Sequence, residues 1–290
     1  MSYIERAFAR FGLNRNIYYK AAFIYFLVSS GVLSMLENMG IVTGNAFRFL
    51  SFAVSIISIP LLFGVIKLFM TDNVYEKPVD STDMIFGYYQ KNGMKSIGTT
   101  FIRNIVCSIP FIIFSIFAIQ FMFRNDLNVE DIILIVTQLV SQEVTDINPI
   151  FIEIIGTLTP YFLIAIVASI ALSMRYQLVQ LLFVDEEYEL RYFEAMKKSA
   201  SLMKRNYWKL TKIYLSIFVI GLAFLILFSI FGLILGFFAA IFTLILGPFA
   251  GIGSYLLLIL NLIITSYIFS IINFAFIEFY EDIIENQKQV

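Results

Sequence analysis

The stretch "MKKSASLMKRNYWKL" at residues 196–210 collects five basic residues and the only tryptophan of a chain that is 60% hydrophobic. Charge is scarce elsewhere, because charged residues make up 14% of the 290 residues, against about 25% in soluble domains. From Ile213 to Ile277 no residue is charged. A positive cluster beside so long an apolar run is typical of a membrane protein whose cations are held at one face of the bilayer.

Apolar runs long enough to cross a bilayer recur along the chain. A helix needs about 20 apolar residues to span a hydrocarbon core of roughly 30 Å. We therefore predict an all-α fold, a polytopic membrane helical bundle that forms a single membrane domain over residues 1–290. About six transmembrane helices are expected, over residues 18–36, 50–70, 103–123, 160–182, 212–233 and 255–277.

The last third of the chain leaves two alternatives open. The uncharged run is longer than two spans need, and the surplus around residues 232–253 contains several glycines and Pro248. We favour an apolar, glycine-broken segment that dips into the outer leaflet or rests on other helices. A third span in this region would instead move the C-terminus to the outside.

The lysines and arginines indicate the orientation. All of them except Arg48 and Arg124 fall on the same side of the predicted spans, and cytoplasmic loops are enriched in these residues. We therefore expect both the N-terminus and the C-terminus to be cytoplasmic.

Two stretches align without gaps and indicate an internal repeat. "FMTDNVYEKPVDSTDMIFGYYQKNGMK" (69–95) and "FVDEEYELRYFEAMKKSASLMKRNYWK" (183–209) each start with an aromatic and acids and end in a [K/R]-N-x-x-K pattern. "LNRNIYYKAAF" near the N-terminus is a looser third copy. The alternative is chance similarity among apolar segments. The predicted repeated helical hairpins are units of a basic amphipathic helix, a membrane hairpin and an acidic exit, at residues 1–75, 76–189 and 190–290.

The basic stretch is predicted to be an elbow helix, an amphipathic helix that lies in the cytoplasmic headgroup layer before the next span. Its apolar stripe recurs at spacings of three and four residues from Leu190 through Met203 to Leu210. The patch either only fixes orientation or binds an anionic lipid headgroup or an acidic partner. The candidate binding residues are Lys197, Lys198, Lys204, Arg205, Lys209 and Trp208.

Polar residues inside the predicted spans are the other functional candidates. Arg175 either snorkels to the cytoplasmic interface or faces the bundle interior, where it would pair with Glu278 or hydrogen-bond Gln177 or Asn273. Asn261 is the polar residue nearest the middle of the last span, and we expect it to bond another helix rather than a substrate. The bilayer midplane is otherwise almost free of charge, unlike that of an ion-coupled pump.

The one large outer loop is predicted to contain an amphipathic segment at residues 124–158. Valines, isoleucines and leucines of "LNVEDIILIVTQLVSQEV" (127–144) fall on one helical face, and acids flank them. This segment is either an ordinary solvated acidic face or a surface for a cationic peptide or a partner protein.

Motifs for catalysis or metal binding are not found. The sequence has no histidine, the commonest general base and metal ligand, and its one cysteine, Cys107, reads as a small apolar filler. We expect no enzyme activity, no cofactor, no metal and no nucleic-acid partner. The expected partners are membrane lipids, anionic ones foremost, and a further membrane protein.

The region around the basic stretch resembles a known family. "EAMKKSASLMKRNYWKLTKIYLSIF" (194–218) is similar to the pattern A-x-x-x-S-x-x-[LM]-M-K-[GR]-N-x-W-[KR]-L, followed by a span. This pattern is characteristic of an uncharacterised bacterial integral-membrane family, number 975 among the domains of unknown function. The closing "FAFIEFYEDI" (274–283) also resembles the family's ending, and the resemblance covers roughly residues 165–285. It implies a bacterial cytoplasmic-membrane protein and no catalytic residues. The matching positions are Ala195, Ser199, Met203, Lys204, Asn206, Trp208, Lys209, Phe279, Tyr280 and Asp282.

Two functions are consistent with these patterns. The first is a non-enzymatic membrane protein that binds lipid or another membrane protein as a scaffold, regulator or accessory factor. The alternative is a transporter or exporter of small solutes or peptides, which the repeats and the mid-span Pro60 and Pro110 favour and the uncharged midplane opposes.

Overall fold

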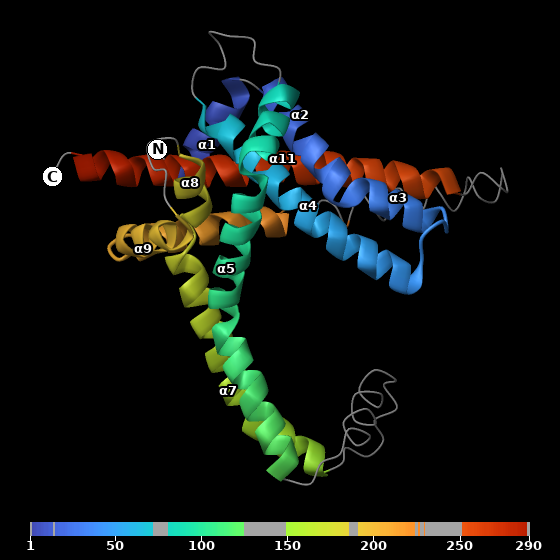
Figure 1. Cartoon of the computed structure of the whole chain (residues 1–290), viewed down its shortest axis with the longest axis vertical. Coiled ribbons are helices and arrows are strands. Elements are labelled where there is room, and N and C mark those ends of the chain that lie inside the picture. The colour runs from blue at the N-terminus through green and yellow to red at the C-terminus, as the bar shows by residue number, and fades with distance from the viewer. Residues whose placement is uncertain are drawn as a thin grey trace. The chain divides into compact units, whose positions relative to one another are not determined.

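The structure is a computed structural model that describes residues 2–13, 15–71, 81–124, 149–185, 191–223, 226, 229 and 251–288. Every regular element in these ranges is a helix (Figure 1), which confirms the predicted all-α class. A helical segment without a label covers residues 207–223. The labelled helices are α1 (Tyr3–Leu13), α2 (Arg15–Phe26), the π-helix η1 (Leu27–Gly31), α3 (Val32–Asn38), α4 (Gly44–Met70), α5 (Ser81–Arg124), α7 (Pro149–Arg175), α8 (Val179–Val184), α9 (Tyr192–Met203) and α11 (Gly251–Lys288).

The described residues contain five helical stretches that are long and apolar enough to cross a membrane. They coincide with five of the six predicted spans, and the chain is a multi-pass membrane protein. The predicted span at 212–233 begins in the helix at 207–223 and continues outside the described residues, as does most of the 232–253 segment. The five stretches are Asn16–Glu37, Gly44–Met70, Lys91–Met122, Gly156–Val184 and Leu258–Lys288.

Two helices begin well before the spans that the sequence predicts within them. α5 is one helix from Ser81, well before the predicted start at residue 103, because the polar entry segment and the span join without a break. α7 begins at Pro149, so the end of the predicted outer segment is helical and continues into the span. The amphipathic pattern at 127–144 lies outside the described residues.

The chain divides into two compact units, Met1–Thr100 with Leu178–Val290, and Phe101–Gln177. In the first unit, α2, α4 and α11 meet at three aromatic side chains. Tyr18 and Phe69 each lie 4.7 Å from Phe274 between ring centroids, and all three side chains are buried. Aromatic pairs at such distances stabilise a core beyond the area that they bury.

Contacts further along the same helices give their directions. Phe26 of α2 packs on Phe269 of α11 at 5.1 Å, and Gly31 of η1 packs on Leu262. As the chain advances from α2 through η1, its contacts therefore move backward along α11, and the two elements are antiparallel. Figure 1 also shows α2 and α3 running alongside α11.

α4 and α5 approach each other at backbone distance. A Cβ atom built on Gly64 would lie 2.8 Å from the carbonyl oxygen of Ile85, closer than real Cβ contacts come. Glycines of this kind let helix backbones touch in membrane bundles. Ile85 is 1% exposed, so the contact lies inside the first unit.

The second unit is a helical hairpin formed by the later part of α5 and by α7. Phe117 packs on Tyr161 at 4.5 Å, and the Ser169 hydroxyl donates a 3.0 Å hydrogen bond to the carbonyl oxygen of Cys107. Large apolar side chains such as Ile113 and Val167 are more than 60% exposed within the unit. Apolar surface of this extent needs a lipid or protein covering.

Candidate functional site

The basic stretch forms the short helix α9, which packs against α8. At its start the Glu194 carboxylate accepts a 2.9 Å hydrogen bond from the backbone N–H of Arg191, one half of a capping box. Nearby, a Cβ on Gly98 of α5 would lie 3.1 Å from the Tyr192 ring, so α5 passes close to this end of α9. One face of α9 packs against the rest of the unit, and its buried side chains are Ala195, Met196, Ser199, Leu202 and Met203.

The predicted continuous helix through residue 210 is wrong. α9 ends at Met203, and a turn at residues 204–206 separates it from the helix at 207–223. The side-chain amide of Asn206 donates a 2.8 Å hydrogen bond to the carbonyl oxygen of Leu202, in the last turn of α9. Asparagine side chains that bond to the backbone compete with the helical ladder, which explains the interruption at this position.

The predicted apolar stripe is only partly buried. Met196, Met203 and Leu210 are buried, but Phe193 exposes 70% of its surface and Tyr207 exposes 37%. The face that packs contains small residues, which allow α9 to lie close to its neighbours. Hydrophobicity along the helix did not distinguish this face from the one that is left open.

Four exposed side chains follow one another along the chain in this region. Two lie on α9, one lies in the turn at residues 204–206, and one lies on the helix at 207–223. Phe193 and Trp208, at 70% and 71% exposure, flank the two lysines. Lys197 and Lys204 form no ion pair with any residue that the structure describes. We call this surface the elbow face, and it consists of Phe193, Lys197, Lys204 and Trp208.

The other predicted binding residues are in different surroundings. Arg205 is exposed beside the elbow face, and Lys198 is half-buried. Lys209 is engaged elsewhere, because its Nζ atom lies 2.9 Å from the Asp282 carboxylate of α11. Lys209 was predicted to contact a lipid or a partner. In the structure it instead links the helix at 207–223 to α11.

Sequence reasoning missed an ionic cluster between α1 and α11. The Arg10 guanidinium lies 3.2 Å from a Glu278 oxygen and 2.8 Å from a Glu281 oxygen, and it donates a 3.3 Å hydrogen bond to the Phe69 carbonyl at the end of α4. Arg6 lies 3.5 Å from Glu278. The Arg10 and Glu278 side chains are 13% and 14% exposed, so this pair is largely removed from solvent.

Tyr3 extends the ionic cluster to Asp282. Its hydroxyl donates a 2.8 Å hydrogen bond to the Asp282 carboxylate, which also receives Lys209. Burial, with this hydrogen bond second, raises the pKa of the Tyr3 phenol to about 12. The neutral phenol is thus the form that the contact favours. The one available signal was the four-residue spacing of Arg6 and Arg10, which puts both cations on one side of a short helix.

The interior pairing predicted for Arg175 stays a prediction, because Arg175 and Glu278 belong to different compact units. Arg175 is the last residue of α7, and its guanidinium lies 5.9 Å from the ring centroid of Tyr176. A cation at a helix C-terminus is favourably placed for the helix dipole. Glu278, the proposed partner, is paired with Arg6 and Arg10.

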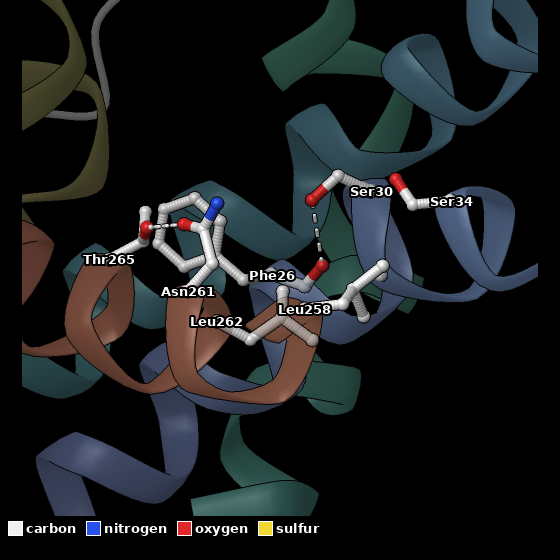
Figure 2. Close-up of a pocket in the computed structure, with 8 residues that line it drawn as sticks. Phe26, Ser30, Ser34, Leu258, Asn261, Leu262 and Thr265 are labelled. Atoms are coloured by element: carbon white, nitrogen blue, oxygen red, sulfur yellow. Dashed lines mark hydrogen bonds between the residues drawn. The ribbon is translucent and has the colours of Figure 1, made fainter. Parts of the chain in front are cut away.

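Asn261 lines a pocket of about 280 Å³ between the η1–α3 segment and α11 (Figure 2). Its side-chain oxygen accepts a 2.9 Å hydrogen bond from the Thr265 hydroxyl one turn further along α11. The expected bond to another helix is thus replaced by one within α11. The pocket is lined by Phe26, Ser30, Gly31, Ser34, Leu258, Asn261, Leu262 and Thr265.

Within the described ranges, no group of three or more Asp, Glu, Cys or His residues is arranged to hold a metal ion. Comparison of the chain with models of known families, with curated proteins and with solved structures gives no match. The resemblance to the bacterial membrane family stays a prediction that rests on the residues quoted for it.

Proposed function

We propose that the chain is a non-enzymatic protein of the bacterial cytoplasmic membrane that binds anionic lipid through the elbow face, as a scaffold or accessory factor. The observation that carries this proposal is the exposure of Phe193 and Trp208 on either side of Lys197 and Lys204. Tryptophan is enriched at the membrane interface, where its ring meets acyl chains and its N–H meets headgroups.

The two lysines supply the charge part of this proposal. A lysine near an anionic leaflet contributes about 1 kcal/mol of attraction, so the pair favours an anionic headgroup over a zwitterionic one by roughly ten- to thirty-fold. The packing of α9 supports the proposal, because a helix that is held on one face presents the exposed Phe193 and Lys197 in a fixed orientation.

The ionic cluster supports a topology with both chain ends at one membrane face. Tyr3 near the start of the chain contacts Asp282 near its end. A chain with both ends on one side crosses the membrane an even number of times, whereas the described residues contain five candidate spans. In this proposal the helix that begins at residue 207 opens the sixth crossing, and the positive-inside rule assigns both ends to the cytoplasm.

Trp208, the only tryptophan, provides a direct test. The full chain is reconstituted into phosphatidylcholine vesicles that contain an equal small fraction of either brominated phosphatidylglycerol or brominated phosphatidylcholine. Bromine quenches indole fluorescence at short range. We expect stronger quenching by the anionic lipid, and we expect Lys197→Gln/Lys204→Gln to remove the difference.

The matched control is Arg48→Gln/Arg124→Gln, which removes two exposed cations from the predicted outer side. This variant should keep the preference for phosphatidylglycerol. Equal quenching by both lipids in the unmodified chain would overturn the proposal. Quenching by neither lipid would also overturn the proposal, and it would indicate that a partner protein covers the elbow face.

Transport remains the second candidate because a pocket lies at Asn261. Neither Pro60 nor Pro110 lines this pocket. A transporter requires the pocket to open in turn to both membrane faces. Solute flux in proteoliposomes that Asn261→Leu abolishes would favour this function.

A further inference from the structure

The pocket at Asn261 contains polar groups that the fold does not use. Among the described residues, the Asn261 amide nitrogen and the Ser34 hydroxyl have no hydrogen-bond partner. Ser30 donates a 3.2 Å hydrogen bond to the Phe26 carbonyl (Figure 2), so its oxygen still has a lone pair to offer. Donors and acceptors on two facing elements can therefore hold one group between them.

The lining excludes charged ligands by its chemistry. None of the described residues that line the pocket is ionisable, and three of them are leucine or phenylalanine. An ion transferred into such surroundings loses hydration that uncharged hydroxyls and one amide cannot replace. A neutral group that donates and accepts hydrogen bonds meets no such cost.

The backbone beside the pocket is a π-helix, an irregularity that occurs often at functional sites. η1 covers Leu27–Gly31, directly before Ser34 in the chain. At its end, a Cβ on Gly31 would lie 3.1 Å from Leu262, so the two walls meet there. Both residues line the pocket, so this contact joins its two walls.

The depth of the pocket can be estimated along α11. Asn261 precedes Glu278 of the ionic cluster by seventeen residues, which corresponds to about 25 Å of helix. If the ionic cluster lies at one interface of a hydrocarbon core of roughly 30 Å, the pocket lies near the opposite interface. Glycerol backbones and ester groups of lipids occupy this level.

The helices that form the pocket also carry exposed apolar side chains. Val32, Ile259 and Ile263 are 48%, 40% and 39% exposed. An acyl chain can lie on these side chains while its polar end enters the pocket. A volume of about 280 Å³ accommodates a glycerol-sized group, since one water takes about 30 Å³.

We propose that this pocket binds the uncharged glycerol hydroxyl and ester groups of a neutral membrane lipid of the diacylglycerol class. The Asn261 amide donates to an ester carbonyl, and Ser34 bonds to the free hydroxyl. The inference does not depend on lipid binding at the elbow face, because the two sites use different residues, and the pocket binds a neutral lipid whereas the elbow face binds an anionic one.

The test uses the full chain in detergent with a photoactivatable diacylglycerol. We expect labelling of peptides from η1–α3 and α11, and we expect Asn261→Leu to reduce it about ten-fold through the lost hydrogen bonds. Ser34→Ala, a small change that leaves folding intact, should reduce labelling two- to five-fold. The matched control is Asn273→Leu, an asparagine of α11 outside the pocket, which should leave labelling unchanged.

Competition separates the possible sources of the ligand. Unlabelled diacylglycerol should displace the probe, whereas phosphatidylglycerol and free glycerol at equal concentration should not. Displacement by free glycerol would assign the chemistry to a soluble polyol and overturn the lipid assignment. Labelling that neither Asn261→Leu nor Ser34→Ala reduces, or equal displacement by phosphatidylglycerol, would overturn the site itself.

Discussion

Arg10 is the residue on which several parts of the first unit converge. Its guanidinium contacts carboxylates of Glu278 and Glu281 on α11 and the Phe69 carbonyl of α4, and it lies 5.6 Å from the ring centroid of Phe274. It thus joins the first helix of the chain to the last one, directly beside the aromatic core. Removing one partner of a largely buried ion pair destabilises a protein strongly, because the other charge stays buried without compensation.

We expect Arg10→Gln to destabilise the protein by about 3 kcal/mol, because Glu278 loses its buried partner. The double variant Arg10→Gln/Glu278→Gln should be less destabilised than the sum of the two single changes, by about 1 kcal/mol or more. Thermal unfolding in detergent measures both effects.

Arg48→Gln serves as the control for this prediction. Arg48 is exposed, so its loss should change the free energy of unfolding by less than about 0.5 kcal/mol. An Arg10→Gln variant as stable as Arg48→Gln would contradict a structural role for the ionic cluster.

At the scale of elements, helix contacts depend on small residues. α9 uses Ala195 and Ser199 on its buried face, and α4 meets α5 at Gly64. In a membrane, large apolar side chains are about as stable against lipid as against another helix. Close backbone approach is therefore what distinguishes a helix–helix contact from a lipid-facing surface.

We predict that Gly64→Ala lowers the free energy of unfolding by about 1–3 kcal/mol, because the new Cβ meets backbone atoms of Ile85 that cannot rotate away. Thermal unfolding, followed by aggregation of the unfolded protein, measures the shift in the unfolding temperature.

Gly221→Ala provides a control of opposite sign. Gly221 is helical, and a Cβ there would have no atom of the described residues within 4 Å. Alanine should stabilise this position by about 0.5–1 kcal/mol. Equal effects of the two substitutions would show that helix propensity, rather than contact between α4 and α5, decides the outcome at Gly64.

At the scale of the whole molecule, the orientation can be measured with single cysteines in a Cys107→Ser background. We expect Ser201→Cys in α9 and Asn286→Cys in α11 to be protected from an impermeant maleimide in intact cells. Asn45→Cys, near the start of α4, should react. All three positions are exposed, so the membrane and not burial determines the result.

Permeabilised cells provide the control, since all three cysteines should then react. Labelling of Ser201→Cys from the outside would contradict the positive-inside assignment. It would also remove the elbow face from the cytoplasmic leaflet and with it the proposed lipid site.

Much of this protein follows from sequence because hydropathy is a property of each segment alone. Five predicted spans coincide with described helices, since a backbone in lipid has to satisfy its own hydrogen bonds and therefore becomes helical. The exposure of the basic stretch also follows from its residue types, because charged groups and the polar end of an indole favour water or headgroups. The exposed residues are Lys197, Lys204, Arg205 and Trp208.

The tertiary structure alone decided which faces meet. The spans are apolar on all sides, so periodicity could not tell a packed face from a lipid-facing one. It also could not tell which side chains of the α9 stripe pack and which, like Phe193, stay exposed. The sequence did not pair Lys209 with Asp282 or Glu278 with Arg10, because these partners are distant in the chain. The pocket at Asn261 has the same origin: its two walls are brought together only by folding, through contacts between helices that no single segment contains.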